Sequence, residues 1–251
     1  MGRTTKIPWS DATWSPWYGC TKVSAGCMNC YAETQNKMYG RSVWGNGVPR
    51  QRSSEAYRKK PFKWNDEAKA AGKRIKVFPS WCDPFDTEVP LEWRTDMWAT
   101  INRTPYLIYL LLTKRARELD QYDSFPTNVW LGVTVENMEM AHERIPHLLN
   151  AKASVRFISA EPMLEKLDLS EYLKVHEEPP YPGRRKIGWV ICGAESGARR
   201  RPFVIPWAID LLKQCRNELI PFFMKQDSAD GPGEQGRIPI NLWNVKEVPD
   251  A

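Results

Sequence analysis

The sequence predicts an α/β fold: a partial (β/α) TIM-like barrel with parallel strands inside and helices outside. Three observations predict it. Short apolar runs recur along the chain, helical stretches separate them, and polar side chains follow each run. Short apolar runs bounded by turn residues are typical of buried parallel strands. Strands that alternate with helices favour a parallel sheet with right-handed crossovers.

Seven segments have the composition of buried strands. In chain order they are residues 12–14, 75–82, 106–112, 129–135, 155–160, 187–193 and 221–224. A chain of 251 residues has the usual size of an α/β barrel, so we expect one domain over residues 1–251.

The segments between the strands carry helical signals. Asn137 is a suitable N-cap, and Pro206 suits the first position of a helix, where its missing N–H costs little. The expected helices cover residues 54–72, 91–102, 138–149 and 206–219. Residues 177–186 (EEPPYPGRRK) read as an exposed excursion. Residues 227–251 read as a C-terminal cap, with INLWNV as a closing strand or part of the cap.

Composition narrows the class of protein. No run of 18 or more apolar residues is present, so no membrane span is expected, and the N-terminus lacks the apolar core of a signal peptide. We therefore expect a cytoplasmic protein whose six cysteines are ligands or core residues rather than disulfides. The net charge of +6 is compatible with a nucleic-acid partner and equally with a solvated basic surface.

Each apolar run ends in polar, reactive side chains. The active sites of parallel barrels are built from the loops at these strand ends, which predicts a polar pocket there. Helix N-caps can account for single residues such as Asn137 but not for Lys114 or Lys225. The set comprises Ser80, Asp83, Thr113, Lys114, Arg115, Glu136, Asn137, Ser159, Glu161, Glu195, Ser196, Lys225 and Gln226.

Three cysteines crowd into one loop near residues 15–33. Six residues separate Cys20 from Cys27, and two separate Cys27 from Cys30. Three soft thiolates on one loop can bind a metal ion or an iron–sulfur cluster. We expect Gly19 and Gly26 to allow unusual backbone angles in this loop. A helix that begins near Ala32 would favour the thiolate form.

The number of ligands separates the candidates. Structural zinc prefers four Cys or His ligands, and the three histidines lie far along the chain, although Cys82 offers a fourth thiol. An iron–sulfur cluster held by Cys20, Cys27 and Cys30 leaves one iron open for a cofactor or substrate. We favour the cluster and keep zinc as the alternative.

Sequence blocks along almost the whole chain resemble a phage- and bacteria-associated family with a three-cysteine motif, which in turn looks like a distant branch of the radical SAM superfamily. The blocks are TWSPWYGCTKVSAGCMNCYAE, PSWCDPF, LLTKR, NVWLGVTVEN, RFISAEPML, WVICGAESGARRRP and PFFMKQ. The resemblance implies a partial barrel of the radical SAM type, a 4Fe–4S cluster on the loop after the first strand, and S-adenosylmethionine (SAM) on the open iron. Reductive SAM cleavage would then yield a 5′-deoxyadenosyl radical that abstracts hydrogen from a substrate.

If the resemblance holds, the order of the strands suggests roles for the residues at the strand ends. Ser80 and Asp83 would accept the SAM ammonium, Lys114 would pair with its carboxylate, and Glu136 or Glu161 would bind the ribose. Tyr31 follows the last cysteine as a further cofactor-binding residue, and Glu195, Lys225 and Gln226 would face the substrate. The spacing departs from the usual radical SAM motif, which has three residues between its first two cysteines and an aromatic residue where Asn29 stands. Ser80-Trp81-Cys82-Asp83 replaces the usual glycine-rich stretch.

Substrate and partners are less defined. The phage association suggests a nucleotide or nucleic acid, as in DNA modification or repair. The runs Arg199–Arg200–Arg201 and Arg184–Arg185–Lys186 could contact phosphates or only solubilise loops. An electron donor is required, and a partner protein is a further candidate. The main alternative is a zinc-stapled, non-catalytic nucleic-acid-binding protein. A SAM-independent cluster enzyme that uses Mg²⁺ ranks last.

Overall fold

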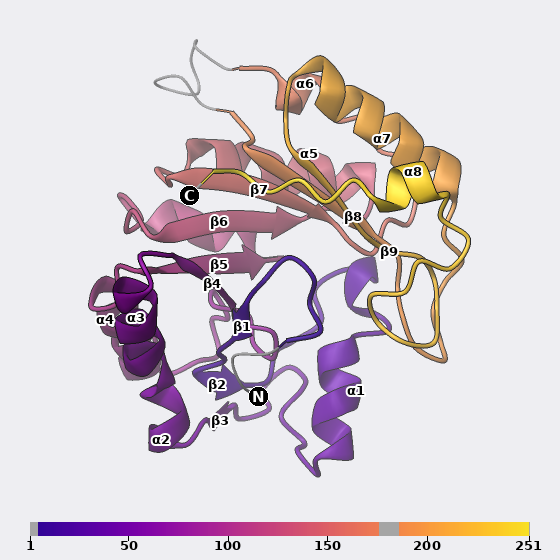
Figure 1. The fold of residues 1–251 in the computed structure, drawn as a ribbon. Helices are drawn as coiled ribbons and strands as arrows, with labels where there is room; N and C mark the ends of the chain where they lie inside the picture. Colours follow the sequence, from indigo (N-terminus) through magenta and orange to yellow (C-terminus); the bar gives the residue numbers. More distant parts are fainter. Residues whose placement is uncertain (1–4, 176–185, 251) are drawn as a thin grey trace.

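A parallel sheet of seven strands forms the centre of the molecule. The computed structural model describes residues 5–175 and 186–250, so residues 177–185 of the predicted excursion lie outside it. The strands are ordered β1-β4-β5-β6-β7-β8-β9, every neighbouring pair is parallel, and the sheet curls into a half-barrel (Figure 1). Their bounds are β1 Ala12–Thr13, β4 Ile75–Phe78, β5 Leu107–Thr113, β6 Val129–Thr134, β7 Val155–Ala160, β8 Trp189–Gly193 and β9 Phe222–Gln226. The predicted α/β partial barrel is confirmed, and all carboxyl ends of the strands meet at one edge.

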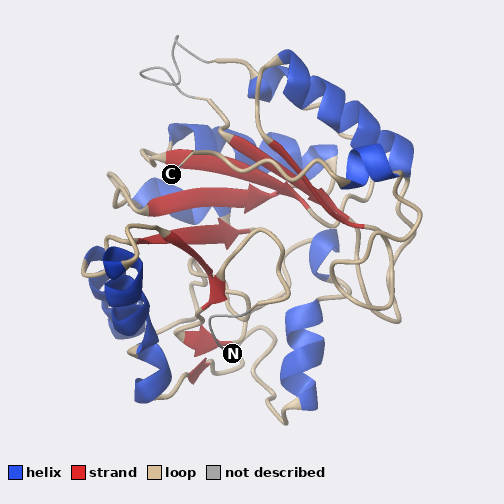
Figure 2. Ribbon diagram, viewed as in Figure 1, coloured by secondary structure: helices blue, strands red, loops and turns tan. Residues whose placement is uncertain are grey.

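Helices flank this sheet (Figure 2). The longer ones are α3 (Lys60–Ala70), α4 (Leu91–Asn102), α5 (Met138–Asn150) and α7 (Ile205–Asn217), with α6 (Ser170–Leu173) as a short addition. The Asn137 side chain caps α5 by accepting a 2.9 Å hydrogen bond from the Met140 N–H, as predicted. The single helix predicted over residues 54–72 is wrong, because the chain forms α2 (Glu55–Arg58) and then α3, which begins anew with Pro61 in its first turn.

Successive residues of each strand point to opposite faces of the sheet. In β5, Leu107, Tyr109 and Leu111 belong to the core that includes buried side chains of the flanking helices. Ile108 and Leu110 belong instead to a second cluster on the other, inner face. That inner cluster is rich in aromatic rings: Trp9, Phe78, Trp130, Phe157, Trp189 and Phe223.

Trp189 is the centre of the inner aromatic cluster. Its ring lies 5.7 Å from the ring of Phe157, 6.1 Å from that of Trp130 and 6.2 Å from that of Phe223. The rings meet edge-on or tilted, as aromatic pairs prefer. These rings fill the part of the inner face that lies away from the carboxyl ends of the strands. We call this inner aromatic cluster the aromatic floor, because the polar residues further along the same strands lie above it.

Gly132 of β6 makes this floor possible. A Cβ atom at this position would lie 2.4 Å from two ring atoms of Phe157. We expect Gly132→Ala to lower the free energy of unfolding by about 1–3 kcal/mol through overpacking. Urea unfolding of Gly132→Ala, Phe157→Leu and the double variant measures the coupling. The smaller Leu should relieve the clash, so strictly additive losses would contradict this packing.

Two segments differ from the predicted elements. The second strand ends at Phe78 rather than at residue 82, because Pro79 has no N–H to continue the ladder. The segment INLWNV is not a strand: it forms α8 (Ile240–Trp243), after which the chain returns beside β9 through an antiparallel bridge between Phe223 and Lys246. The small sheet of β2 (Trp17–Tyr18) and β3 (Gln51–Arg52) was not predicted.

Across the described ranges, no helix combines the length and apolar character that crossing a bilayer requires.

Candidate functional site

Polar side chains gather on the inner face where the strands end. The Lys114 Nζ donates to the Thr134 hydroxyl over 3.3 Å, and Lys225 forms an ion pair with Glu161. A Cβ atom on Gly193 would lie 3.3 Å from the Lys225 Cβ and 3.5 Å from the Glu161 Cδ, so β7, β8 and β9 converge here. The structure thus brings Lys114, Glu161 and Lys225 to one edge above the aromatic floor.

The cysteine loop lies against this edge and is held there by Glu136. The Glu136 Oε1 accepts hydrogen bonds from the Ser24 hydroxyl and, over 3.1 Å, from the Gly26 N–H. The backbone at Gly26 comes so close that a Cβ would lie 2.9 Å from the Glu136 carboxyl and 3.2 Å from the Lys114 Cε. Gly26 is therefore needed for close approach and does not have the left-handed backbone predicted for it, whereas Gly19 does, with φ of 114°.

Glu136 is itself held in place by a residue of α5. The Arg144 Nη1 donates to Glu136 Oε2 over 2.8 Å, and both residues are almost wholly buried. Burial alone would raise the pKa of Glu136, but the charges of Arg144 and Lys114 and the bonds from Ser24 and Gly26 hold it below its ordinary value. The carboxylate is thus kept ionised as an acceptor for the loop.

Glu195 holds the other end of the same loop. Its Oε2 accepts from the Asn29 side-chain amide over 3.1 Å and from the Arg201 N–H over 2.8 Å. Arg201 also pairs with Glu195 through its guanidinium and donates to the Ala25 carbonyl over 3.0 Å. Burial opposes ionisation of Glu195, but the bonds from Arg201 and Asn29 outweigh it and lower its pKa. Glu136 and Glu195 therefore bind the cysteine loop, a role that the sequence did not indicate.

Cys20 lies beside a third charged group. The Arg115 Nη1 lies 3.4 Å from the Cys20 Sγ and 2.8 Å from the Asp83 Oδ2. Asp83 also accepts from the Thr113 hydroxyl over 3.0 Å and from the Phe85 N–H over 2.9 Å. Three donors of the protein thus already bind Asp83, and its predicted bond to the SAM ammonium would be a further one.

The three thiols of the loop are free, and Cys20 and Cys30 each lie near a cation. Burial raises the pKa of Cys20 to about 12, opposed by Arg115, and burial raises the pKa of Cys30, opposed in part by Lys114. Cys30 is also the residue directly before α1 (Tyr31–Met38), close to the predicted start. Cys82 lies behind the loop, is partly buried, and has a pKa that desolvation raises well above its ordinary value. In the described ranges, no three Cys, His, Asp or Glu side chains converge on a single metal ion.

The remaining predicted residues fall into two groups. Tyr31 donates from its hydroxyl to the Ser80 carbonyl over 3.0 Å, and the Ser80 hydroxyl is buried without a partner beside the loop. Gln226 does not face an open site, because its amide donates to the Ala194 carbonyl over 2.7 Å and its oxygen accepts from the Gly233 N–H over 2.9 Å. Gln226 thus supports the backbone at the site, and its role toward a substrate stays a prediction.

The structure adds residues that sequence reasoning missed. Ser24, Asn29 and Arg144 hold the loop or its anchors, and so does Arg201, which the sequence suggested only as a possible phosphate contact. Arg144 alone carries a signal, since it is a charged residue among Ala141, Ile145 and Leu148 on the apolar side of α5. The arginine run splits, because Arg201 pairs with Glu195 and Arg200 with Asp230, while Arg184 and Arg185 lie outside the described residues.

A comparison with protein-family models identifies the family of the chain. Residues 4–237 match the family described as "Protein of unknown function (DUF5131)". The chain belongs to the DUF5131 family. The match covers nearly the whole length, as did the family resemblance inferred from the sequence blocks, but it carries no activity. No curated protein and no solved structure matches this DUF5131 chain. The phage association and the radical SAM relationship therefore remain predictions.

The carboxylate anchors predict how stability depends on pH. The folded-state pKa values of Glu136 and Glu195 lie below the ordinary 4.5, so their stabilising contribution is complete above pH 4.5 and is lost as the pH falls through the folded values. We expect urea unfolding to show a steep loss of stability below pH 4.5. The loss should be smaller in Glu195→Gln, which starts from a lower plateau at neutral pH. An unchanged pH dependence in this variant would contradict the assignment.

Proposed function

We propose that this DUF5131 protein is a radical-SAM-like iron–sulfur enzyme. One observation carries the proposal: two carboxylates hold a loop with three free cysteines against the polar carboxyl-end edge of a parallel half-barrel. Parallel barrels build their active sites at this edge. A loop bound there by its own hydrogen bonds is a preorganised scaffold for ligands.

The residues present fit a cluster better than a single ion. A tetrahedral zinc ion needs its sulfur ligands within about 4 Å of one another, since each Zn–S bond is about 2.3 Å long. In a 4Fe–4S cluster each cysteine ligates a different iron, so convergence on one point is not needed. Arg115 beside Cys20 and Lys114 near Cys30 suit the negative charge of thiolate ligands. The unpartnered Ser80 hydroxyl beside the loop is a polar group available to a cofactor.

In this proposal Cys20, Cys27 and Cys30 hold a 4Fe–4S cluster whose open iron takes SAM. When bound, the pair supplies a 5′-deoxyadenosyl radical for hydrogen abstraction. Lys114 contacts Thr134 and is near both Glu136 and Cys30, which supports its proposed pairing with the SAM carboxylate. Ser80 would accept the SAM ammonium. The Glu161–Lys225 pair on the inner face would bind the ribose and the substrate. The aromatic floor would keep water away from the side of the site that faces the inner surface of the sheet.

Release of 5′-deoxyadenosine tests the proposal. Anaerobically reconstituted protein with dithionite and SAM should form it, and Lys225→Met should lower the rate about 10–100-fold, in keeping with loss of one positioned charge. Lys59→Met is the matched control, because Lys59 forms an exposed pair with Glu55 far from the strand ends. A protein with a full cluster and no 5′-deoxyadenosine above the background of the triple-cysteine variant would contradict the proposal.

No observation favours the zinc-stapled nucleic-acid-binding alternative. His142 and His147 hydrogen-bond through Nδ1 to Tyr172 and Asp120, each over 2.7 Å, and neither belongs to a group of three or more potential metal ligands in the described ranges. The four-ligand requirement of structural zinc is thus not met by the described side chains around the loop.

A further inference from the structure

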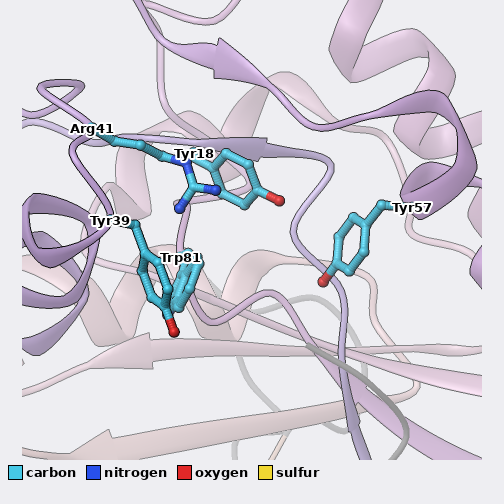
Figure 3. A pocket seen from close by; sticks show the side chains of 5 residues that line it. All are labelled: Tyr18, Tyr39, Arg41, Tyr57 and Trp81. Carbon is cyan, nitrogen blue, oxygen red and sulfur yellow. The ribbon is translucent and has the colours of Figure 1, made fainter.

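A pocket lined by aromatic rings around Arg41 lies beside the start of the cysteine loop. Its volume is about 240 Å³, and its walls are Tyr18, Tyr39, Arg41, Tyr57 and Trp81. Figure 3 shows the Arg41 side chain reaching across the Tyr18 ring, Tyr39 beside Trp81, and Tyr57 facing them from the other side. None of the roles described above uses these residues.

The sequence places Arg41 there through the end of α1. Gly40 has φ of 69°, its N–H bonds to the Lys37 carbonyl over 3.0 Å, and the Arg41 N–H bonds to the Asn36 carbonyl over 2.9 Å. These two bonds form a Schellman motif, in which glycine readily adopts the left-handed conformation. This turn reverses the direction of the chain and brings Arg41 to a position from which its side chain reaches the Tyr18 ring. The backbone turn therefore determines where the guanidinium lies.

The guanidinium is stacked but has no anionic partner. Its carbon lies 4.5 Å from the centre of the Tyr18 ring, 5.5 Å from that of Tyr39 and 5.7 Å from that of Trp81. Its Nη1 is buried without a hydrogen bond, and no carboxylate of the described chain pairs with it. Arg41 as a whole is half-buried, but leaving its Nη1 buried without a partner is costly, and cation–π contacts offset only part of that cost. An oxyanion at the open edge of the guanidinium would supply the anionic partner that the described chain does not.

The rings define the rest of the ligand. Tyr39 is 67% exposed, whereas Trp81 behind it is 8% exposed and is fixed by a 3.0 Å bond from its Nε1 to the Gln35 side chain. An exposed ring backed by a fixed one is a stacking platform for a planar group. An acidic peptide would satisfy Arg41 but not the rings. A planar base joined to a phosphate satisfies both.

We propose that this pocket binds a nucleotide, with its phosphate on Arg41 and its base against Tyr39 and Trp81. The pocket adjoins the proposed active site, because Gly19, which precedes Cys20, donates to the Trp81 carbonyl over 3.2 Å and pairs with Cys82. The assignment of this nucleotide as the substrate, or the part of a nucleic-acid substrate held outside the barrel, rests on the proposed function. The binding itself does not require the cluster.

Fluorescence anisotropy of the full chain with a labelled single strand of about ten nucleotides tests the site. Arg41→Ala and Tyr39→Ala should each weaken binding about tenfold or more, and Arg41→Lys should lose less, because it keeps the charge without the planar stack. Arg103→Ala is the matched control, since Arg103 lies 4.8 Å from the centre of the Phe62 ring and should bind like the wild type. Circular dichroism establishes that each variant is folded.

Competition by 5′-AMP, adenosine and inorganic phosphate separates the two halves of the ligand. 5′-AMP should compete better than either half alone. Tighter binding of the strand than of 5′-AMP assigns nucleic acid, and equal affinity assigns a free nucleotide. Wild-type affinity in both Arg41 variants, or an equal loss in Arg103→Ala, would overturn the site. Iron content and 5′-deoxyadenosine release report the proposed function separately, so failure of one is distinguishable from failure of the other.

Discussion

Replacing Arg144 with methionine is expected to lower the free energy of unfolding by about 3–5 kcal/mol. Arg144 and Glu136 form an ion pair whose side chains are 2% and 0% exposed. Methionine keeps most of the apolar contact but leaves the Glu136 carboxylate buried with only its loop donors. At this chain length each kcal/mol shifts the melting temperature by about 2–4 °C, so the melting temperature should fall by about 6–20 °C.

The companion variant shows whether charge is the cause. Glu136→Gln in the Arg144→Met background removes the unpaired charge and keeps an acceptor for Ser24 and Gly26, so the double variant should be more stable than Arg144→Met alone. Thermal and urea unfolding of both single variants and the double variant complete the cycle. A double variant as unstable as the sum of the two single variants would show that Arg144 stabilises the fold through packing alone.

Gly26→Val is expected to reduce cluster retention about 10–100-fold while the half-barrel stays folded. The Val side chain would start 2.9 Å from the Glu136 carboxyl, so the loop must lift away from the strand ends. Glu136 acts on the thiols only by holding the backbone of the loop, as outer-shell residues do around other metal centres. Iron and labile sulfide per chain after anaerobic gel filtration measure the effect.

Ala25→Val is the matched control for this variant. Ala25 is the neighbouring residue of the same short 3₁₀ turn (Ala25–Cys27), and its side chain faces solvent. It should retain iron like the wild type. Full retention in Gly26→Val, or equal loss in both variants, would contradict the view that close docking on Glu136 positions the cysteines.

The sheet was predictable because its signal is local. Buried parallel strands such as β5 and β6 are continuous apolar runs, and their order along the chain suggests a barrel. Elements that depend on tertiary contacts were missed. The two-residue strands β2 and β3 are too short to show an alternation of apolar and polar residues. The break between α2 and α3 at Lys59 follows from Pro61, which lies in the first turn of the new helix.

The site was predictable in its position but only partly in its roles. The strand ends do gather Lys114, Glu161 and Lys225, because parallel strands share one edge. The roles of Glu136 and Glu195 depend on partners more than 100 residues away in the chain, Gly26 and Asn29, which no spacing rule identifies. Gln226 was assigned to a substrate, but its two hydrogen bonds to backbone groups engage it in structure.

The central claim is that Cys20, Cys27 and Cys30 hold a cluster with one iron open to SAM. Electron paramagnetic resonance of the anaerobically reconstituted and reduced protein, recorded with and without SAM, tests it most directly. We predict a reduced 4Fe–4S signal that shifts when SAM is added and that is absent from the Cys20→Ala, Cys27→Ala, Cys30→Ala triple variant. A colourless protein that carries stoichiometric zinc and gives no such signal would contradict the account.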